Sequence, residues 1–368
     1  MGEFKFNRNC KSFPGRWACD IMTAEGYMSC KECKFYEPVS KRILIIKLGA
    51  MGDVIRTTPL LKNIRKKYKN SQITWLINKE SADLIRNEYV DRILIYNHDS
   101  ILRLQFEEFD VLFSLEIDTP GSAVANLIKA KDKYGYYLDK DGHPNYFNEK
   151  ARFYLERVFS NFVNRHNKKT YQEMMSDICE LKYSEEECIL NFNDSHGKDF
   201  LRRNHLGTSD KFVGIHMGSA PRWPSKVWNK NKLIELIKKM KENVILFAGP
   251  NEAKEQKELV EELNRSGVKV YVNDPNNTVR EFISLVNLCD TMLVNDSFAL
   301  HVAVALKKKV VALFFCTPPW EIEDYGRVKK IVSPLLDKYF YTDEYVEKLV
   351  DSIGVDEVYD ALKTFLNN

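Results

Sequence analysis

Short runs of aliphatic and β-branched residues recur along this chain, and most are followed by a segment whose apolar residues have helical spacing. A strand that is buried on both faces shows such a continuous run, whereas an amphipathic helix repeats its apolar positions every three to four residues. The alternation is typical of parallel sheets built from βαβ units. The predicted strands lie at 42–48, 73–77, 92–96, 111–115, 212–215, 244–247, 268–272, 291–294 and 310–315.

These strands form two series, separated by a polar stretch at 193–211 that has the composition of a linker. The 368 residues also exceed one ordinary domain. We therefore expect an α/β fold with two Rossmann-like, doubly wound domains and the deepest cleft between them. Helices are predicted at 54–67, 150–181, 230–241, 252–264, 279–287 and 298–306. The predicted units are a cysteine-rich segment at 1–40, a first domain at 41–195, a second at 210–335 and a C-terminal helical segment at 336–368.

Composition narrows the class of protein. The formal net charge is +3, from 55 basic and 52 acidic residues, so the overall charge gives no reason to expect nucleic acid or a membrane surface as a partner. No apolar run approaches the roughly 18 residues of a membrane span. Residues 1–9 are polar and lack the apolar core of a secretory signal. We expect a cytoplasmic protein whose thiols stay reduced.

The first candidate for chemistry is the sequence KLGAMGDVIRTTP at 47–59, which follows a predicted strand. Gly49 and Gly52 permit close backbone approaches, and Asp53 arrives at the start of the next helix. Open α/β sheets bind their ligands at this place, beyond the carboxyl ends of the strands. Asp53 is therefore a candidate catalytic carboxylate. The alternative is that Asp53 only caps the helix, a position that Asp favours.

Two strand ends in the second series carry polar side chains at the equivalent edge. Ser219 follows the strand at 212–215 in a Gly-Ser turn, and Lys226 arrives just before the next helix. With nearby backbone amides, this hydroxyl and this ammonium suit a diphosphate held without a metal, although a loop lysine is more often simply solvated. Glu252 follows the strand at 244–247 and suits ribose hydroxyls, or it complements the dipole of the helix that it opens.

A third strand end of that series carries the sequence DSFALH. Asp296 and Ser297 stand where a helix begins, so they either cap it or direct its free amides at an anionic group. His301 comes about one helical turn later and can face the same edge. A single helical histidine is more often structural than functional. The common position of these candidates at strand ends favours a shared site.

Four of the eight cysteines crowd into the first 33 residues, at Cys10, Cys19, Cys30 and Cys33. A short segment without a core of its own gains stability from a metal. Four thiolates suit a closed tetrahedral site, with zinc as the first choice and iron as the second. Only one CxxC pair is present, so disulfides, free thiols and a redox CxxC stay as alternatives.

Several of these motifs together resemble glycosyltransferase family 9, the family of the ADP-heptose lipopolysaccharide heptosyltransferases. The resemblance rests on KLGAMGDVIRTTPLL, SKVW after a Gly-Ser turn, GPNE, DSFALH and TPPW, in this order from about residue 41 to 332. CKSFPGRWAC, CKEC and NKKTYQE resemble a cysteine-bearing subgroup of that family. The resemblance implies a GT-B fold, inverting transfer without a catalytic metal, and a last helix that crosses back onto the first domain.

The resemblance also implies a role for each candidate. Asp53 matches the general base, and Gly52 and Ser219 lie in the donor site. Lys226 matches a lysine on the donor phosphate, and Glu252 an acidic residue near the ribose. Asp296 and His301 match the ends of the family motif Asp-Thr-Gly-x-x-His. Ser297 and Phe298 replace its Thr-Gly, and a phenylalanine there prevents the close backbone approach that glycine permits.

The sequence therefore predicts transfer of a heptose or related sugar from an ADP-sugar to an acceptor hydroxyl, with Asp53 as the base. The acceptor is a glycan, a glycolipid or a protein, and peripheral contact with a membrane stays open. One alternative is a GT-B enzyme for another nucleotide sugar, either a UDP-sugar transferase or an epimerase. The other is a non-enzymatic module that binds nucleic acid through its cysteine segment.

Overall fold

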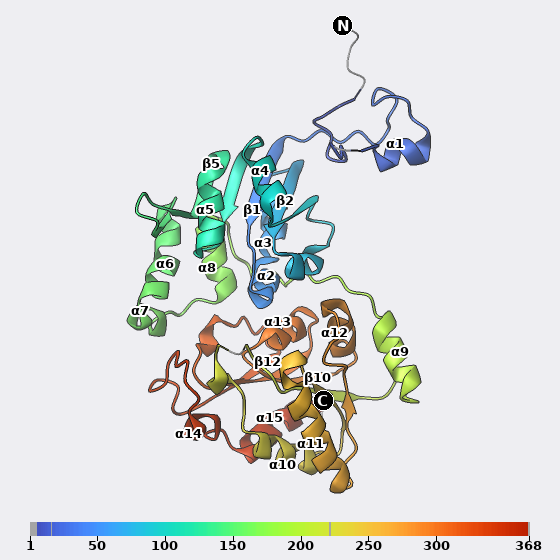
Figure 1. The fold of residues 1–368 in the computed structure, drawn as a ribbon, viewed down its shortest axis with the longest axis vertical. Helices are drawn as coiled ribbons and strands as arrows, with labels where there is room; N and C mark the ends of the chain where they lie inside the picture. Colours follow the sequence, from blue (N-terminus) through green and yellow to red (C-terminus); the bar gives the residue numbers. More distant parts are fainter. Residues whose placement is uncertain (1–5, 16, 221, 367–368) are drawn as a thin grey trace.

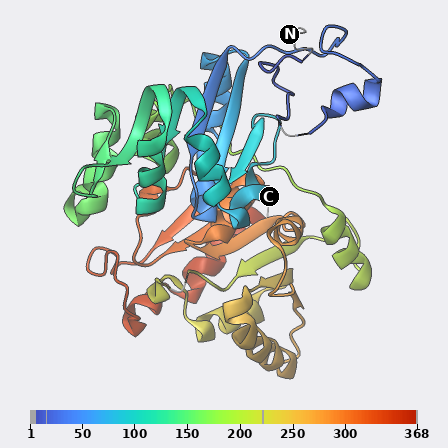
Figure 2. The same cartoon turned by 45° about the horizontal axis from the view of Figure 1, so that its top comes forward.

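The computed structural model describes residues 6–15, 17–220 and 222–366. Two α/β domains lie one above the other, each built around a six-stranded sheet (Figure 1). Figure 2 shows the two sheets as separate parts of the molecule, with the cysteine-rich segment lying away from the second domain. Among the described residues, no helix is long and apolar enough to cross a bilayer.

The N-terminal sheet has the strand order β3-β2-β1-β4-β5-β6, and β1 lies in its interior. All pairs are parallel except the last, β5 with β6. Ile46, the last residue of β1, pairs with Leu76 of β2 and Ser114 of β4, so these three strands end at one level. The segments that follow them therefore meet at one sheet edge. The strands are β1 Lys41–Ile46, β2 Ser71–Ile77, β3 Arg92–Ile95, β4 Glu108–Ser114, β5 Lys129–Leu138 and β6 Pro144–Tyr146.

The helices of this domain are shorter than the apolar pattern predicts. The helix expected at 54–67 is divided at Thr58 and Pro59, because proline has no N–H to donate to the preceding turn. The stretch at 150–181 forms three helices, and Ser160 and Thr170 cap the second and third. The helical elements are α2 Met51–Thr57, α3 Leu60–Lys67, η1 Lys79–Ile85, α4 His98–Leu104, α5 Thr119–Leu127, η2 Glu149–Ala151, α6 Arg152–Phe159, α7 Asn161–Arg165 and α8 Tyr171–Ile178.

The C-terminal sheet is parallel throughout, with the order β12-β11-β10-β7-β8-β9. Its strands are β7 Phe212–His216, β8 Asn243–Phe247, β9 Tyr271–Val272, β10 Thr291–Asn295, β11 Lys309–Phe314 and β12 Val328–Val332. Its helical elements are α9 Ser195–Arg203, η3 Pro224–Lys226, α10 Lys230–Lys239, η4 Pro250–Glu252, α11 Ala253–Arg265, α12 Val279–Val286, α13 Phe298–Ala305, η5 Pro319–Glu321, α14 Glu347–Val350 and α15 Val355–Leu366.

Two expectations about the connections need correction. The polar stretch at 193–211 contains α9, which packs on α12 where the N–H of Gly197 donates to Ser284 Oγ at 2.8 Å. The C-terminal segment does not place α15 on the first domain, as the resemblance implied. Val358 and Leu362 of α15 belong to the hydrophobic core of the second domain, against α10, β10 and β11. An apolar helix face buries itself where a matching apolar surface lies nearest.

The sequence pattern did not predict three of the strands, namely β5, β6 and β12. β5 reads KAKDKYGYYL, and its N-terminal half is largely exposed. β12 is an edge strand that reads VKKIV. Edge strands carry charged residues that protect them from pairing with other chains, and this breaks the apolar run by which central strands are recognised.

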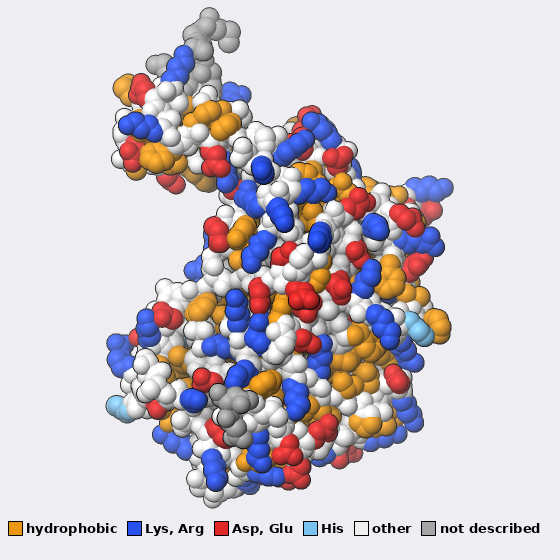
Figure 3. Space-filling view, turned by 180° about the vertical axis from the view of Figure 1, so that it is seen from behind, with side chains coloured by type: hydrophobic (Ala, Val, Ile, Leu, Met, Phe, Trp, Pro, Cys, Tyr) orange, Lys and Arg blue, Asp and Glu red, His pale blue; other side chains and the backbone are white. Residues whose placement is uncertain are grey.

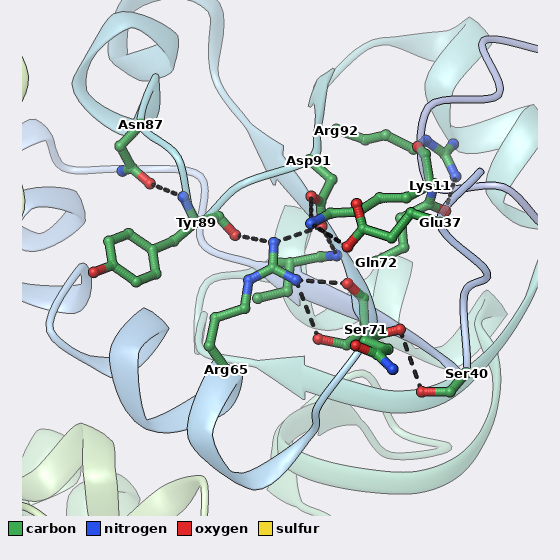
Figure 4. Close-up of polar contacts among 12 residues, drawn as sticks. Lys11, Glu37, Ser40, Arg65, Ser71, Gln72, Asn87, Tyr89, Asp91 and Arg92 are labelled. Atoms are coloured by element: carbon green, nitrogen blue, oxygen red, sulfur yellow. Dashed lines mark hydrogen bonds and ion pairs between the residues drawn. The ribbon is translucent and has the colours of Figure 1, made fainter. Parts of the chain in front are cut away.

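The cysteine-rich segment contains α1 Asp20–Glu25 and is attached to the N-terminal sheet by polar contacts (Figure 4). Lys11 Nζ lies 3.3 Å from Asp91 Oδ1, and Asp91 Oδ2 accepts from Arg65 at 2.6 Å. The backbone carbonyl of Lys11 accepts from the side chain of Gln72. These contacts join the segment to β2 and to the residue before β3, at the end of the sheet remote from the second domain (Figure 1).

Candidate active site

A cavity of about 580 Å³ lies between the two domains, at the edges where the strands of both sheets end. Its first-domain wall comes from α2, and its second-domain wall from the loops after β7, β8, β10 and β11. All the residues that the sequence predicted for catalysis or donor binding line this one cavity. These residues are Gly52, Asp53, Ser219, Lys226, Glu252, Asp296, Ser297 and His301.

Asp53 lies in the first turn of α2 but does not cap that helix. The N-cap position belongs to Ala50, which has no side-chain acceptor. The carboxylate instead forms ion pairs, at 2.6 Å with Arg56 Nη2 and at 3.8 Å with Lys47 Nζ. The backbone carbonyl of Asp53 accepts from Thr57 Oγ1 at 2.7 Å. The local structure thus fixes the carboxylate by charge, and the capping alternative does not describe it.

Lys47 is a buried lysine that links Asp53 to a second carboxylate. Its ammonium lies 3.1 Å from Glu116 Oε1, and only 4% of the residue is exposed. The same oxygen of Glu116 accepts the N–H groups of Leu48 and Gly49, at 2.6 and 3.1 Å. A buried charge persists only when it is paired and hydrogen-bonded. Glu116 therefore holds both the lysine and the backbone that leads into α2.

The charge state of Asp53 follows from these neighbours. Burial by itself raises the pKa of a carboxyl group, but here the positive charges of Arg56 and Lys47 outweigh it and lower the pKa of Asp53 to about 2. The carboxylate is therefore ionised across the physiological pH range. About 31% of the side chain is exposed, which leaves it accessible to a molecule in the cavity.

Gly52 and His301 bring the two domains into contact beside Asp53. A Cβ atom on Gly52 would lie 2.3 Å from Cδ2 of His301, so a larger residue would have to displace the imidazole. Burial and the nearby charge of Arg56 lower the pKa of His301 to about 3. The imidazole is therefore neutral at pH 7 and suits hydrogen bonding rather than charge neutralisation.

Lys226 and Asp296 form an ion pair on the opposite wall. Their Nζ and Oδ2 atoms lie 2.7 Å apart, and Thr317 Oγ1 donates to the same oxygen at 2.7 Å. Burial raises the pKa of Asp296, but Lys226 and His301 outweigh this and hold it below its ordinary value. The ammonium of Lys226 is thereby positioned at the cavity by a carboxylate behind it.

The position of the Glu252 side chain in the cavity depends on two glycines, Gly249 and Gly218. Its Oε2 accepts the N–H of Gly249 at 3.0 Å, so the side chain folds back over the start of η4. A Cβ atom on Gly218 would lie 2.6 Å from the carboxyl carbon of Glu252. The absence of a side chain on Gly218 therefore leaves space for the Glu252 carboxylate. Glu252 and Ser219, from the loops after β8 and β7, line the same cavity.

Ser297 and Phe298 give the cavity one polar and one aromatic feature. Ser297 is the N-cap of α13, yet its buried Oγ has no hydrogen-bond partner among the described residues. Phe298 packs on Phe282 with ring centroids 5.7 Å apart, and Phe282 also contacts His216. Burial lowers the pKa of His216 to about 4, so its ring is neutral at pH 7. An unpaired buried hydroxyl is costly unless a ligand completes it.

Sequence reasoning missed several residues that line the cavity or lie directly behind its lining. Arg56 carried a usable signal, because a residue three positions after Asp53 lies on the same side of a helix. Glu321 carried a weaker one, since it directly follows TPPW. Lys47 stands inside a quoted motif but is recognisable only from its buried pairing with Glu116. Thr317 and Tyr341 also line the cavity.

The four N-terminal cysteines are far from this site and share a different cavity, of about 430 Å³, with several aromatic residues. All four are half-buried free thiols. Within 6–15, 17–220 and 222–366, no three or more His, Cys, Asp or Glu side chains are arranged so that they could hold a metal ion. The donor set is chemically suited to a metal, and the metal site stays a prediction.

Residues 100–341, about two thirds of the chain, match the sequence model of the family described as glycosyltransferase family 9 (heptosyltransferase). The chain belongs to glycosyltransferase family 9. It is therefore a glycosyltransferase, so the alternative of a non-enzymatic module is wrong.

Individual relatives of this family 9 glycosyltransferase agree with its fold. Lipopolysaccharide heptosyltransferase 1 of Campylobacter coli is 22% identical over 88% of this chain and 97% of its own. The family 9 glycosyltransferase of Veillonella parvula has a TM-score of 0.70 and 20% identity, with 90% of this chain and 98% of that one covered. The Escherichia coli structure named ADP-heptose lps heptosyltransferase II has a TM-score of 0.63 and 17% identity over 89% and 98%. The expected GT-B fold is thus confirmed.

Proposed function

We propose that this enzyme transfers a heptose from an ADP-heptose donor to an acceptor hydroxyl, with inversion at the anomeric carbon and Asp53 as the general base. The observation that carries the proposal is the arrangement of opposite charges across the cavity. An ionised carboxylate lies on the first domain, and the ammonium of Lys226 lies on the second. The names of the Campylobacter coli and Escherichia coli relatives support heptose as the sugar and ADP as the nucleotide.

In the proposed reaction the acceptor oxygen attacks the anomeric carbon on the face opposite the diphosphate. The new bond joins that oxygen to the anomeric carbon, and the bond to the diphosphate oxygen breaks with its electron pair leaving on ADP. The acceptor proton passes to Asp53. A positioned general base contributes on the order of 10² to 10⁴ in rate. Closure of the two domains over the substrates would exclude water, which otherwise competes as an acceptor.

The second domain stabilises the charge that develops on the leaving diphosphate. Lys226 supplies a positive charge, and the hydroxyl of Ser297, which is buried without a partner among the described residues, supplies a donor. Backbone amides near Ser219 and at the start of α13 add further donors. This set replaces the metal ion that many transferases use. Glu252 accepts hydrogen bonds from the ribose hydroxyls.

The proposed acceptor is a hydroxyl group of a glycolipid. The Campylobacter coli relative is named for lipopolysaccharide, which supports a glycolipid core as the first choice. A hydroxyl on another glycan or on a protein side chain presents the same chemistry to Asp53. We also propose that the reaction takes place in the cytoplasm, where the free thiols of this chain stay reduced.

The test is incubation of the full chain with ADP-heptose and with glycolipid-core, glycan and peptide acceptors, read by mass spectrometry. Transfer to one acceptor class with release of ADP supports the proposal. A thermal-shift series with ADP, UDP and GDP separates it from the UDP-sugar alternatives, because a ligand at 100 times its Kd stabilises by about 2.7 kcal/mol. Stabilisation by UDP rather than ADP would overturn the choice of donor.

We further propose that Cys10, Cys19, Cys30 and Cys33 hold a structural metal, with zinc favoured over iron. All four thiols line one cavity in a segment that lacks a core of its own. Metal binding would draw them into a tetrahedral set and stabilise the segment. The transfer reaction needs no step at this site, which lies away from Asp53.

A further inference from the structure

Helices α6 and α7 have an inverted distribution of polar and apolar side chains. Their buried positions include Arg157 and Asn164, whereas Phe159 and Phe162 are 66% and 71% exposed. Val158 is 48% exposed beside them. Single exposed apolar residues are common on monomers, but a contiguous group of them marks an interaction site. The outer face of this helix pair is therefore built for contact with something else.

Contacts on the buried side of α6 and α7 hold the two helices in this orientation, so that their phenylalanines stay on the outside. Arg157 Nη1 lies 2.5 Å from Glu321 Oε1 of the second domain and 2.8 Å from Asn164 Oδ1. The guanidinium of Arg165 stands over the ring of Phe340, 4.9 Å from its centroid. These contacts fix the orientation of both helices at the rim of the active-site cavity, which Glu321 also lines.

The same stretch carries an excess of positive charge. Residues 149–169 contain six Lys and Arg against two Glu, and the buried one, Arg157, pairs with Glu321. The other five are exposed, namely Lys150, Arg152, Arg165, Lys168 and Lys169. Arg152 forms ion pairs with Glu149 and Glu156, and Lys169 forms one with Asp177, so the excess comes mainly from Lys150, Arg165 and Lys168. Figure 3, which views the molecule from behind, shows orange hydrophobic side chains gathered with blue and pale blue ones along the edge that carries α6 and α7.

We propose that this α6–α7 surface docks on an anionic lipid bilayer. We define it by its exposed apolar residues, Phe153, Val158, Phe159 and Phe162, and by the five exposed basic residues above. Apolar side chains that insert at the headgroup boundary, surrounded by cations that meet anionic headgroups, are the combination that holds a protein on a membrane surface.

Charge decides between a bilayer and a second copy of the chain. A symmetric dimer through this surface would bring together two copies of one patch with an excess of positive charge, which is unfavourable. A bilayer of anionic lipid supplies the opposite charge. If the acceptor is a glycolipid, docking here brings it to the rim of the cavity; that consequence rests on the proposed function, whereas the docking itself does not.

The test is co-sedimentation of the full chain with vesicles, without any nucleotide sugar. We expect binding to vesicles of phosphatidylglycerol and phosphatidylcholine, and weaker binding to phosphatidylcholine alone. The double variant F159S/F162S should lose at least about tenfold in partition coefficient, since each phenylalanine gives up apolar insertion. The double variant K150E/K168E should lose at least about tenfold in partition coefficient on anionic vesicles and change little on phosphatidylcholine vesicles.

The matched control is F106S, because Phe106 is 83% exposed but lies between α4 and β4, outside the α6–α7 surface. It should bind vesicles as the wild type does. Unchanged thermal midpoints and ADP binding show that each variant is folded. Wild-type protein that ignores anionic vesicles would overturn the proposal, as would F159S/F162S that binds them normally. A dimer in light scattering that F159S/F162S dissociates, without vesicle binding, would assign the surface to a second copy instead.

Discussion

Nη2 of Arg56 lies 2.6 Å from Oδ1 of Asp53, one helical turn back along α2. The guanidinium is held from its other side by the ring of Tyr171, whose centroid is 4.0 Å from Cζ. The proposed base is therefore oriented by a cation that is itself fixed by packing. The same cation keeps the carboxylate ionised, so that position and charge state have one physical origin.

Replacing Asp53 by Asn removes the proton acceptor while preserving size. We expect kcat to fall by about 10² to 10⁴ with ADP affinity within a factor of two to three. Steady-state kinetics and calorimetric titration with ADP measure the two quantities. Asp99→Asn on the exposed face of α4 is the control and should be normal. Near-normal transfer by the Asp53 variant would remove Asp53 from the catalytic role.

Replacing Arg56 by Gln should change the pH profile of kcat/KM as well as its maximum. In the wild type the pKa of Asp53 is about 2, so its protonation causes no loss of activity between pH 5 and 8. Without the positive charge of Arg56, burial raises that pKa, and an acid limb should move toward neutral pH. Rates measured from pH 4.5 to 8 test this. A profile unchanged in shape would show that Arg56 does not control the ionisation.

Replacing Lys226 by Gln should weaken ADP binding by at least about tenfold, the value of a charge-assisted hydrogen bond. Part of this loss comes from Asp296, whose carboxylate is left unpaired and repels the diphosphate. The double variant Lys226→Gln with Asp296→Asn should therefore bind ADP better than the single variant. Equal affinity of the two variants would mean that the ion pair does not face the diphosphate.

The stability of the protein should fall on acidification below pH 6.5, partly because of His301. The pKa of His301 is about 3 in the folded protein, whereas an unperturbed histidine, as in the unfolded chain, has a pKa of 6.5. Between these two pH values the unfolded chain binds a proton that the folded chain excludes. This histidine alone lowers the free energy of unfolding by about 1.4 kcal/mol per pH unit in that window. Chemical denaturation at pH 7, 6 and 5 measures the slope. His301→Gln should reduce it, whereas His143→Gln, at an exposed position, should not.

The purified protein should contain about one metal ion per chain if the N-terminal cysteines bind it as proposed. The double variant Cys30→Ser with Cys33→Ser should lose the metal and the stability of the first 40 residues, measured by elemental analysis and limited proteolysis. Cys188→Ser, a buried cysteine of the first domain, is the matched control and should keep the metal. A metal-free chain that resists proteolysis at this segment would contradict the proposal.

Periodicity predicted the central strands well because they are buried on both faces. β1, β4 and β10 all ended within two residues of expectation, and their ends define where Asp53 and Asp296 lie. The edge strand β12 escaped because its lysines interrupt the apolar run. The C-terminal helix α15 was recognised as a helix but assigned to the wrong domain, since an amphipathic pattern identifies a buried face without saying what covers it.

The sequence by itself determined the two-domain α/β architecture, the family and the eight residues that gather in the cleft. It did so because strand ends are readable locally and parallel sheets bring those ends to one edge. Only the tertiary structure decided the pairings: Arg56 and Lys47 on Asp53, Glu116 on Lys47, and Arg157 across the domains to Glu321. Such contacts join residues up to 164 positions apart. Their charge states depend on burial and on neighbours from other elements, which no local pattern contains.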